Sequence, residues 1–356
     1  MNGSDTDIET LSDLSKIHLL GRVRCNFVLR GSRPKEETQE LHINAARGFV
    51  FDVPMQTGTF SGRSATTGSR LPGIDAQERP LVRAEEVWVK RLAPDGTIDE
   101  LICPELMLKF RNEVEPTTGE PIADTLTLEH LQAWGARVEI HSPARELNIT
   151  ANEVMYSVDA RQIDIRNRNN GVSDKQKYVK LDQGVTSGGD IDAKDSKGSA
   201  RLVVPHVRML HTADGELQRI ECLGQGILRA TRPAAYDANE STAALDDQPT
   251  EFGAHWRRSL TLQVAPDWKT QYLTLQGGAK VAELNRRVSL SAMTIAMKLF
   301  SEPDSPASAI PIVSADHSKK EELPGAELMA SLRPERLTAS GNVVAEEAAR
   351  GLLPAL

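Results

Sequence analysis

A short unit of alternating apolar and polar residues recurs along this 356-residue chain and constrains its fold more than any other feature. In its clearest copy, Leu147, Ile149 and Ala151 alternate with polar residues, and Val154 and Tyr156 continue the pattern after a shift of one position. A period of two places successive side chains on opposite faces of a β-strand. The unit therefore predicts two short strands, joined where the phase of the alternation changes.

Similar stretches appear in several other parts of the chain. The corner sequence Gly278-Ala-Lys-Val echoes Gly135-Ala-Arg-Val, and Val288-Ser-Leu-Ser-Ala echoes Leu147-Asn-Ile-Thr-Ala. A further copy begins at Leu337, and weaker copies lie at 21–46 and 220–230. A unit of this size cannot bury its apolar face alone, so its copies must stack on their neighbours.

On these residues the chain resembles a known repeat family. The stretch Leu337-Thr-Ala-Ser-Gly-Asn-Val-Val, together with the copies at 130–166 and 255–345, is similar to the OstA-like repeat of the lipopolysaccharide-transport proteins LptA and LptC and of the N-terminal part of LptD. The resemblance implies an all-β fold, an elongated stack of antiparallel strands called a β-jellyroll. It also implies an apolar interior that carries acyl chains, and open ends that join edge to edge with other copies. The chain departs from the family in its length, its long polar insertions and the lack of an export signal.

The resemblance and the composition divide the chain into four regions. We expect N-terminal OstA-like repeats with long loops at 1–125, central repeats at 126–300, a linker at 301–330 and the start of a further, truncated repeat at 331–356. Polar residues, Gly and Pro dominate 54–79, 167–197 and 232–250, which we interpret as loop insertions.

The remaining stretches predict strands. The alternation favours strands at 19–29, 40–53, 98–110, 200–210 and 217–231, with Pro205 interrupting one of them. Residues 289–300 also match helical spacing, so a helix competes with a strand there. Strands do not alternate with helices along the chain, which excludes a parallel α/β sheet.

The composition limits the partners and the compartment. A net charge of −8 argues against a nucleic-acid partner, and the chain has no run of eighteen apolar residues that would span a bilayer as a helix. The polar start is not a signal peptide, and the last copy of the unit stops at Leu356 without a partner strand. We therefore expect a piece of a longer exported chain, located in the periplasm.

Catalytic and metal-binding signatures are lacking. The eight histidines show no metal-ligand spacing, and the glycines form no nucleotide-binding loop, so we expect no catalytic residue, no metal and no cofactor. The cysteines are too few for a disulfide framework. Cys25 and Cys103 have two interpretations, either buried thiols or one bridge in an oxidising compartment. Two interpretations are also open for the arginines at 161, 166, 168, 257 and 258. They either contact phosphorylated or acidic head groups or belong to a solvated face.

The apolar faces of the strands are the best candidates for a binding site. Thirteen residues on these faces are the candidate lining of a lipid groove: Leu147, Ile149, Val154, Tyr156, Leu260, Leu262, Val264, Leu273, Leu275, Val288, Leu290, Ile295 and Met297. In a closed sandwich the same residues would fill a core between two sheets about 10 Å apart. In an open fold they would shelter acyl chains, at about 0.8 kcal/mol per buried methylene. An aromatic content of only 4% favours the aliphatic groove.

These observations lead to one functional hypothesis and two alternatives. The hypothesis is a non-catalytic protein that binds or bridges lipopolysaccharide or another amphipathic lipid and pairs with other OstA-like modules through its edge strands. The first alternative is a structural spacer without a ligand. The second is a β-helical polysaccharide-active enzyme, which would need two carboxylates facing each other across a cleft.

Overall fold

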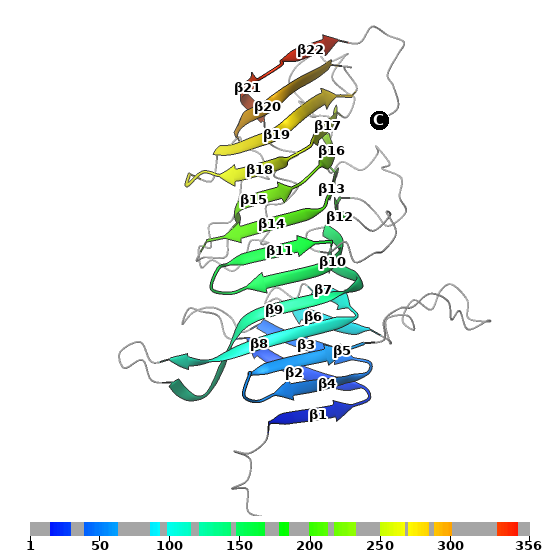
Figure 1. Cartoon of the computed structure of the whole chain (residues 1–356), viewed down its shortest axis with the longest axis vertical. Coiled ribbons are helices and arrows are strands. Elements are labelled where there is room, and N and C mark those ends of the chain that lie inside the picture. The colour runs from blue at the N-terminus through cyan, green and yellow to red at the C-terminus, as the bar shows by residue number, and fades with distance from the viewer. Residues whose placement is uncertain are drawn as a thin grey trace, which may run out of the picture. The chain divides into compact units, whose positions relative to one another are not determined.

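Antiparallel strands make up most of the part of the chain that the computed structural model describes (Figure 1). The structure describes residues 15–29, 39–62, 86–92, 98–114, 121–143, 147–167, 178–184, 199–212, 217–232, 250–267, 270–284, 288–300 and 333–347. The all-β class predicted from the alternation is confirmed, and the strand registers given below are all antiparallel. In the described residues, no helix is both long enough and apolar enough to cross a membrane.

The strands belong to two compact units. Unit 1 comprises Met1–Pro94, Glu100–Val138 and Glu153–Ala160, and unit 2 comprises Asp95–Asp99, Glu139–Asn152 and Arg161–Leu356. Three strands contribute residues to both units: β7 (Ile98–Cys103), β9 (Pro121–Ser142) and β10 (Leu147–Ser157). The division at 125 and 126 expected from the sequence is thus not the boundary between the compact units.

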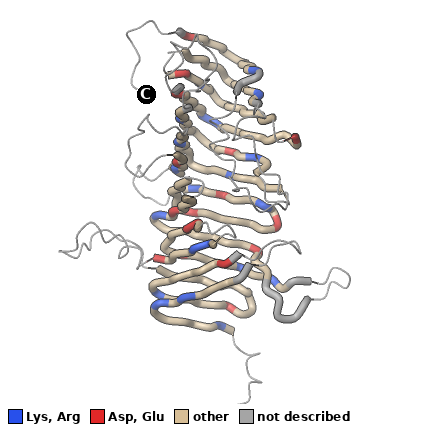
Figure 2. Tube along the Cα trace, turned by 180° about the vertical axis from the view of Figure 1, so that it is seen from behind, with Lys and Arg blue, Asp and Glu red and all other residues tan. Residues whose placement is uncertain are grey.

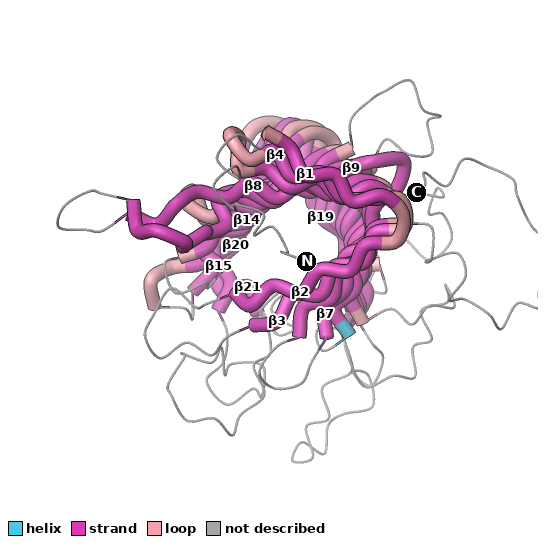
Figure 3. Tube along the Cα trace, turned by 90° about the horizontal axis from the view of Figure 1, so that it is seen from below, coloured by secondary structure: helices cyan, strands magenta, loops and turns pink. Residues whose placement is uncertain are grey.

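Unit 1 contains two ladders of paired strands. Its own strands are β1 (Lys16–Leu20), β2 (Val23–Leu29), β3 (Gln39–Ala45), β4 (Gly48–Asp52), β5 (Thr57–Ser61), β6 (Val87–Leu92) and β8 (Glu105–Val114). Ladder A pairs β1, β4, β5, β8 and the first part of β9 in that order, and ladder B pairs β2, β3 and β6. Seen end-on, β1, β4 and β8 lie on one side of the unit and β2 and β3 on the other (Figure 3).

Unit 2 repeats this arrangement with more strands. They are β11 (Gln162–Arg166), β12 (Val179–Gln183), β13 (Ser199–Val204), β14 (His206–His211), β15 (Leu217–Leu223), β16 (Gly226–Arg232), β17 (Thr250–Trp256), β18 (Ser259–Val264), β19 (Thr270–Glu283), β20 (Val288–Phe300), β21 (Arg333–Ser340) and β22 (Val344–Glu347). Ladder A pairs β11, β14, β15, β18, β19, β20 and β21. Ladder B pairs β10, β12, β13, β16, β17, β19, β20 and β22.

A line of corners connects the two ladders of each unit. In unit 2 the Gly224 N–H donates to the Arg258 carbonyl at 2.8 Å, and the Arg258 N–H donates to the Gln276 carbonyl at 3.0 Å. In unit 1 the Gly21 N–H donates to the Arg47 carbonyl at 3.1 Å in the same way. These bonds satisfy backbone groups where the chain leaves one ladder for the other. Each corner is therefore tied to the corner of a neighbouring strand.

The corners divide most of the strands predicted from the sequence. The predicted strand at 19–29 is β1 and β2, and that at 40–53 is β3 and β4. Those at 98–110, 200–210 and 217–231 are likewise two strands each, one on either side of Pro104, Pro205 and Gly224. The alternation shifts by one position at some corners, as between Ala45 and Gly48, but keeps its phase at others, as between Trp256 and Leu260. Phase alone therefore did not mark every change of ladder.

Two of the predicted loop insertions contain strands. β5 lies within 54–79 and pairs with β4 and β8, and β12 lies within 167–197 and pairs with β10 and β13. Both strands have few large apolar residues, which is why composition favoured loops. The competing helix at 289–300 is wrong, because β20 pairs along its length with β19. The greater part of the insertion at 232–250 and the linker at 301–330 lie outside the described residues.

The two Gly-x-Val corner sequences have equivalent settings. β19 pairs with β18 up to Gln276 and with β17 from Lys280 onward, and it changes partner through Gly277 and Gly278. β9 pairs with β8 up to Trp134 and also pairs with β7, with Gly135 at the bend. Two of these glycines, Gly277 and Gly278, have φ of +88° and +82°, a region that other residues rarely adopt. The recurrence found in the sequence is therefore a recurrence of structure.

Candidate functional site: the aliphatic interior of unit 2

An unbroken row of aliphatic side chains crosses ladder B of unit 2. Successive register partners in this row are Ile149, Leu181, Leu202, Leu228, Ala254, Val281, Leu290 and Ala345. Leu202, Leu228 and Ala254 are buried. Because strand side chains alternate between faces, these residues share the buried face of the ladder. Eight strands thus contribute one aliphatic residue each to the same line.

Ladder A of unit 2 carries two such rows. The row nearer the corners contains Ile165, Val207, Cys222, Leu260, Leu275, Ile295 and Ala339, and the next contains Ile163, Met209, Ile220, Leu262, Leu273, Met297 and Leu337. The first six residues of the corner row are all buried. We call the buried faces of the two ladders the interior of unit 2. Its lining is mainly aliphatic, and it also includes the Cys222 thiol, the Trp256 ring and the carboxamides of Gln183 and Gln271.

Most of the thirteen predicted groove residues face this interior. Nine are buried: Ile149, Val154, Leu260, Leu262, Val264, Leu273, Leu275, Ile295 and Met297. Leu147, Tyr156 and Leu290 are half-buried, and Val288, at the start of β20, is 45% exposed. Val154 and Tyr156 belong to unit 1, and the other eleven belong to unit 2. The structure therefore brings eleven of them into one unit and assigns two to the other.

The predicted groove residues omit six of the eight residues in the ladder B row and four of the seven in each ladder A row. Leu181, Leu202, Leu228 and Val281 were not candidates, although they occupy the same line as Ile149 and Leu290. β12 and β16 show only two or three apolar residues each, so their own alternation is weak. The available signal was the spacing from each residue to the nearest corner, which identifies positions that share a row.

The interior of unit 1 differs because it contains phenylalanine rings. Phe49 and Phe60 lie on neighbouring strands of ladder A with ring centroids 4.5 Å apart. Phe27 of ladder B stacks on Phe110 of ladder A at 6.1 Å, so the inner faces of the two ladders meet. Five of the seven phenylalanines lie in this unit, Phe51 being the fifth. The phenylalanines are thus concentrated in unit 1, whereas the rows that line the interior of unit 2 are mainly aliphatic.

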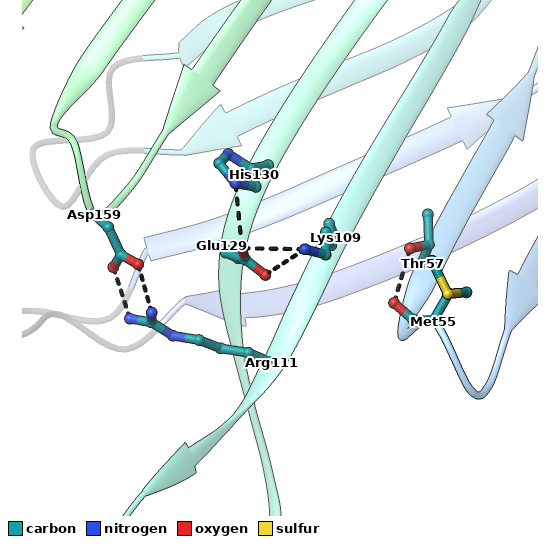
Figure 4. Close-up of polar contacts among 7 residues, drawn as sticks. All are labelled: Met55, Thr57, Lys109, Arg111, Glu129, His130 and Asp159. Atoms are coloured by element: carbon teal, nitrogen blue, oxygen red, sulfur yellow. Dashed lines mark hydrogen bonds and ion pairs between the residues drawn. The ribbon is translucent and has the colours of Figure 1, made fainter.

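Paired charges hold the rim of unit 1 (Figure 4). Both nitrogens of the Arg111 guanidinium donate to the Asp159 carboxylate, at 2.5 and 2.7 Å. Lys109 donates to Glu129 at 3.1 Å, and His130 lies 3.3 Å from the same carboxylate. The hydrogen bond from Lys109 is the main cause that lowers the pKa of Glu129. Because each carboxylate is matched by a cation, this cluster joins strands and offers no spare charge to a substrate.

A second cluster lies on the outward face of unit 2, centred on Asp164. Burial raises the pKa of Asp164, but hydrogen bonds from Gln162, His206 and Arg208 outweigh it, so this pKa lies below its usual value. Arg208 also lies 3.6 Å from Glu221 on the next strand. Basic and acidic residues are interspersed along the described strands (Figure 2).

The same Glu-x-His motif occurs on the outward faces of both units. In unit 1 the two ring nitrogens of His42 lie 2.8 Å from the Asn26 side-chain oxygen and 3.1 Å from the Glu40 carboxylate. In unit 2 those of His141 lie 2.7 Å from Asn148 and 3.0 Å from Glu139. The motif spans two paired strands each time, which gives the two units a second shared feature that sequence analysis overlooked.

The candidate arginines do not form a single site. Arg161 lies at the turn before β11, where its carbonyl accepts the His211 N–H, and Arg257 and Arg258 lie at the corner between β17 and β18. Arg168 lies outside the described residues. Arg166 is the last residue of β11, at the end of the strand away from Arg161. These arginines therefore lie in separate places, and their contacts to head groups stay a prediction.

Thiols and metal ligands were the remaining candidates. Cys25, Cys103 and Cys222 are free, so the bridge between Cys25 and Cys103 does not form in this structure. Burial raises the pKa of Cys103 and raises that of Cys222 to about 12, which keeps both thiols protonated and unreactive. Within the described ranges, His, Cys, Asp and Glu form no group of three or more that could hold a metal ion.

Comparison with known proteins adds no relative to this account. No protein-family model, no curated protein and no solved structure matches the chain. The similarity to the OstA-like repeat therefore depends on the residues quoted above, and function must be argued from the interior itself.

Proposed function

We propose that this chain is a non-catalytic binding protein for an amphipathic lipid, of the kind handled in lipopolysaccharide transport. The observation that carries the proposal is the set of continuous aliphatic rows that line the interior of unit 2. An acyl chain gains about 0.8 kcal/mol for each methylene it buries, and rows that cross seven or eight strands offer a long apolar contact. The branched aliphatic lining matches a flexible hydrocarbon better than the stacked rings of unit 1 do.

The ends of the ladders support partners of similar fold. In the described part of the chain, β1 pairs only with β4, and its Leu20 is 89% exposed. At the last strands of unit 2, Leu337, Val343 and Val344 are also exposed. A strand with an unpaired edge and exposed apolar residues is a template for another strand. We propose that these edges pair with other OstA-like modules, in a periplasmic assembly of which this chain is a part.

One observation favours the structural spacer as a second candidate. Nine of the thirteen predicted groove residues are buried in the protein without a ligand. A spacer needs an interior that its own side chains fill, and such burial is what a filled interior would give. The polysaccharide enzyme loses its structural basis, because a β-helix is built from parallel strands and the registers here are antiparallel.

Native mass spectrometry separates the two candidates. The chain is expressed in a Gram-negative host, purified without detergent and measured intact. Lipid binding predicts adducts with the mass of acylated lipids, which organic extraction then releases for identification. If the protein shows only its bare mass, even after incubation with host lipid extract, lipid binding is contradicted and the structural spacer is favoured. The matched variants are Leu273→Asp, which puts a charge in the interior, and Tyr272→Asp, which puts one on the outward face of the same strand. Only the first should lose the adducts.

A further inference from the structure

Two polar groups in the interior of unit 2 have no hydrogen-bond partner in the described structure, the indole N–H of Trp256 on β17 and the carboxamide of Gln271 on β19. The carboxamide of Gln271, on β19, is fully buried, and in the described structure neither its oxygen nor its nitrogen has a partner. Gln271 shares the inward face of its strand with Leu273 and Leu275, and Tyr272 between them is 47% exposed. The amide is therefore aimed at the interior and away from solvent.

The neighbours of Gln271 across the ladder are all apolar. Its register partners are Val264 on β18 and Leu299 on β20, and both are buried. The two positions beyond it on β19 continue the aliphatic rows, with Leu262 and Met297 beside Leu273, and Leu260 and Ile295 beside Leu275. Gln271 is thus the one polar member of a block of nine inward residues on three strands.

Gln271 lies at one end of this block of inward residues, and the corner of β19 lies at the other end. Thr270, the preceding residue, lies at the hairpin turn, where its N–H and hydroxyl both donate to the Asp267 carboxylate. Leu275 lies close to the corner at Gly277. At 3.4 Å per residue, it is about 14 Å further along the strand than Gln271. The amide is therefore at the rim end of an apolar track, and the corner is at its far end.

An unpaired buried amide destabilises the unliganded protein, because its desolvation is not offset by a hydrogen bond. A leucine or methionine of similar size would remove that cost and complete the aliphatic rows. The same amide becomes favourable when a bound molecule offers an acceptor to its N–H or a donor to its oxygen. A ligand with one polar group at the head of a hydrocarbon tail meets both the amide and the track.

We propose that the carboxamide of Gln271 is the polar contact of an acyl-chain site inside unit 2. It hydrogen-bonds a carbonyl or hydroxyl group at the head of the chain, and the hydrocarbon tail extends over Leu273 and Leu275 towards the corner. This inference rests on the proposed lipid-binding function and adds to it the chemistry that the site selects, an oxygen-bearing acyl group in preference to a plain alkyl chain.

A pair of matched lipids tests this selection. The probes are 1-myristoyl-lysophosphatidylcholine, which has an ester carbonyl, and its 1-O-tetradecyl ether analogue, which lacks it. Titration calorimetry below the critical micelle concentration gives the Kd of each for the full chain. The wild type should bind the ester roughly 2- to 10-fold more tightly than the ether, the range that one hydrogen bond contributes.

Three variants identify the source of the preference. Gln271→Met and Gln271→Leu should bind the two lipids equally while keeping the affinity for the ether. Gln263→Leu, an exposed glutamine on the neighbouring strand, should keep the wild-type preference. The two Gln271 variants differ in shape, and thermal unfolding checks that each retains the fold.

The outcomes separate the inference from the function on which it rests. An ester preference that survives in Gln271→Met would overturn the role of Gln271 and leave lipid binding intact. The same conclusion follows if the wild type binds both lipids equally, as it would if a buried water satisfied the amide. Failure of the wild type to bind either lipid would overturn the proposed function and this inference together.

Discussion

Phe27 of β2 and Phe110 of β8 stack across the interior of unit 1, with their ring centroids 6.1 Å apart and their planes inclined by 25°. The two residues come from different ladders, so their contact joins the inner faces of ladder A and ladder B. Offset aromatic pairs contribute about 0.5–1.5 kcal/mol beyond the area they bury. This contact is the direct sign that the two ladders enclose a common interior in unit 1.

A double-mutant cycle should detect this contact. Phe27→Ala and Phe110→Ala should each lower the free energy of unfolding by about 1–3 kcal/mol, because both rings are only partly buried. Together they should cost about 0.5–1.5 kcal/mol less than the sum. Phe252→Ala in unit 2 is the control, which should add to Phe110→Ala within about 0.5 kcal/mol. Urea denaturation measures all the variants, and strict additivity of the Phe27 and Phe110 effects would show that the ladders do not meet there.

The corner of β19 should tolerate alanine at one glycine better than at the other. Gly277 and Gly278 both have positive φ, which costs other residues about 1–2 kcal/mol. A Cβ on Gly277 would lie 2.6 Å from the Arg258 Cβ and 2.9 Å from its backbone nitrogen, whereas one on Gly278 would have only the Arg257 Cδ within 4 Å, at 3.8 Å. Gly277→Ala should therefore lower the Tm clearly more than Gly278→Ala in a thermal unfolding experiment. Equal losses of Tm would mean that glycine is required only for its backbone conformation. The close approach of β19 to the β17–β18 corner would then not matter.

The Asp164 cluster should make unit 2 sensitive to acid. The pKa of Asp164 in the folded protein lies below its reference value of 3.8, so its ionised form stabilises the fold at neutral pH. That contribution is present above about pH 4 and is lost as the pH falls through the lowered pKa. Asp164→Asn should lower the free energy of unfolding by about 1–3 kcal/mol at pH 7, and the difference from wild type should shrink below pH 4.

A surface ion pair provides the comparison for Asp164. Asp159→Asn removes the exposed partner of Arg111 and should cost at most about 1 kcal/mol. Urea unfolding of the wild type and both variants between pH 3 and pH 7 provides the data. A cost for Asp164→Asn that is the same at pH 3 as at pH 7 would contradict the role assigned to its ionised carboxylate.

The alternation of residues predicted strands but not their division between ladders. In the stretch 40–53 the buried positions shift from Ala45 to Gly48, where the structure bends the chain into β3 and β4 through Ala46 and Arg47. Other corners, such as that between Trp256 and Leu260, keep the phase, so period two alone does not identify a corner. Glycines such as Gly277 can be read from the sequence, but only the structure shows their positive φ and the change of strand partner at that point.

Strands with a weak alternation were not predicted from the sequence, because they are stabilised mainly by neighbouring strands. β12 has the sequence Val-Lys-Leu-Asp-Gln, and composition assigned it to a polar loop. Its Leu181 lies between Ile149 and Leu202 in the aliphatic row, and this placement is what makes the strand favourable. Intrinsic β-propensity is small compared with burial between two neighbours. The residues predicted to line the groove are therefore mostly buried where alternation was strong, and the predicted set is incomplete where a row depends on short strands.

Site-specific photo-crosslinking in cells tests the central claim, that the interior of unit 2 holds an acyl chain. A diazirine amino acid of leucine-like size replaces either Leu273, which faces the interior, or Tyr272, which faces outward from the same strand. The proposed function predicts that illumination attaches lipid to the protein from position 273 and not from position 272. Equal lipid labelling from the two positions, or labelling from neither in a folded protein, would contradict it.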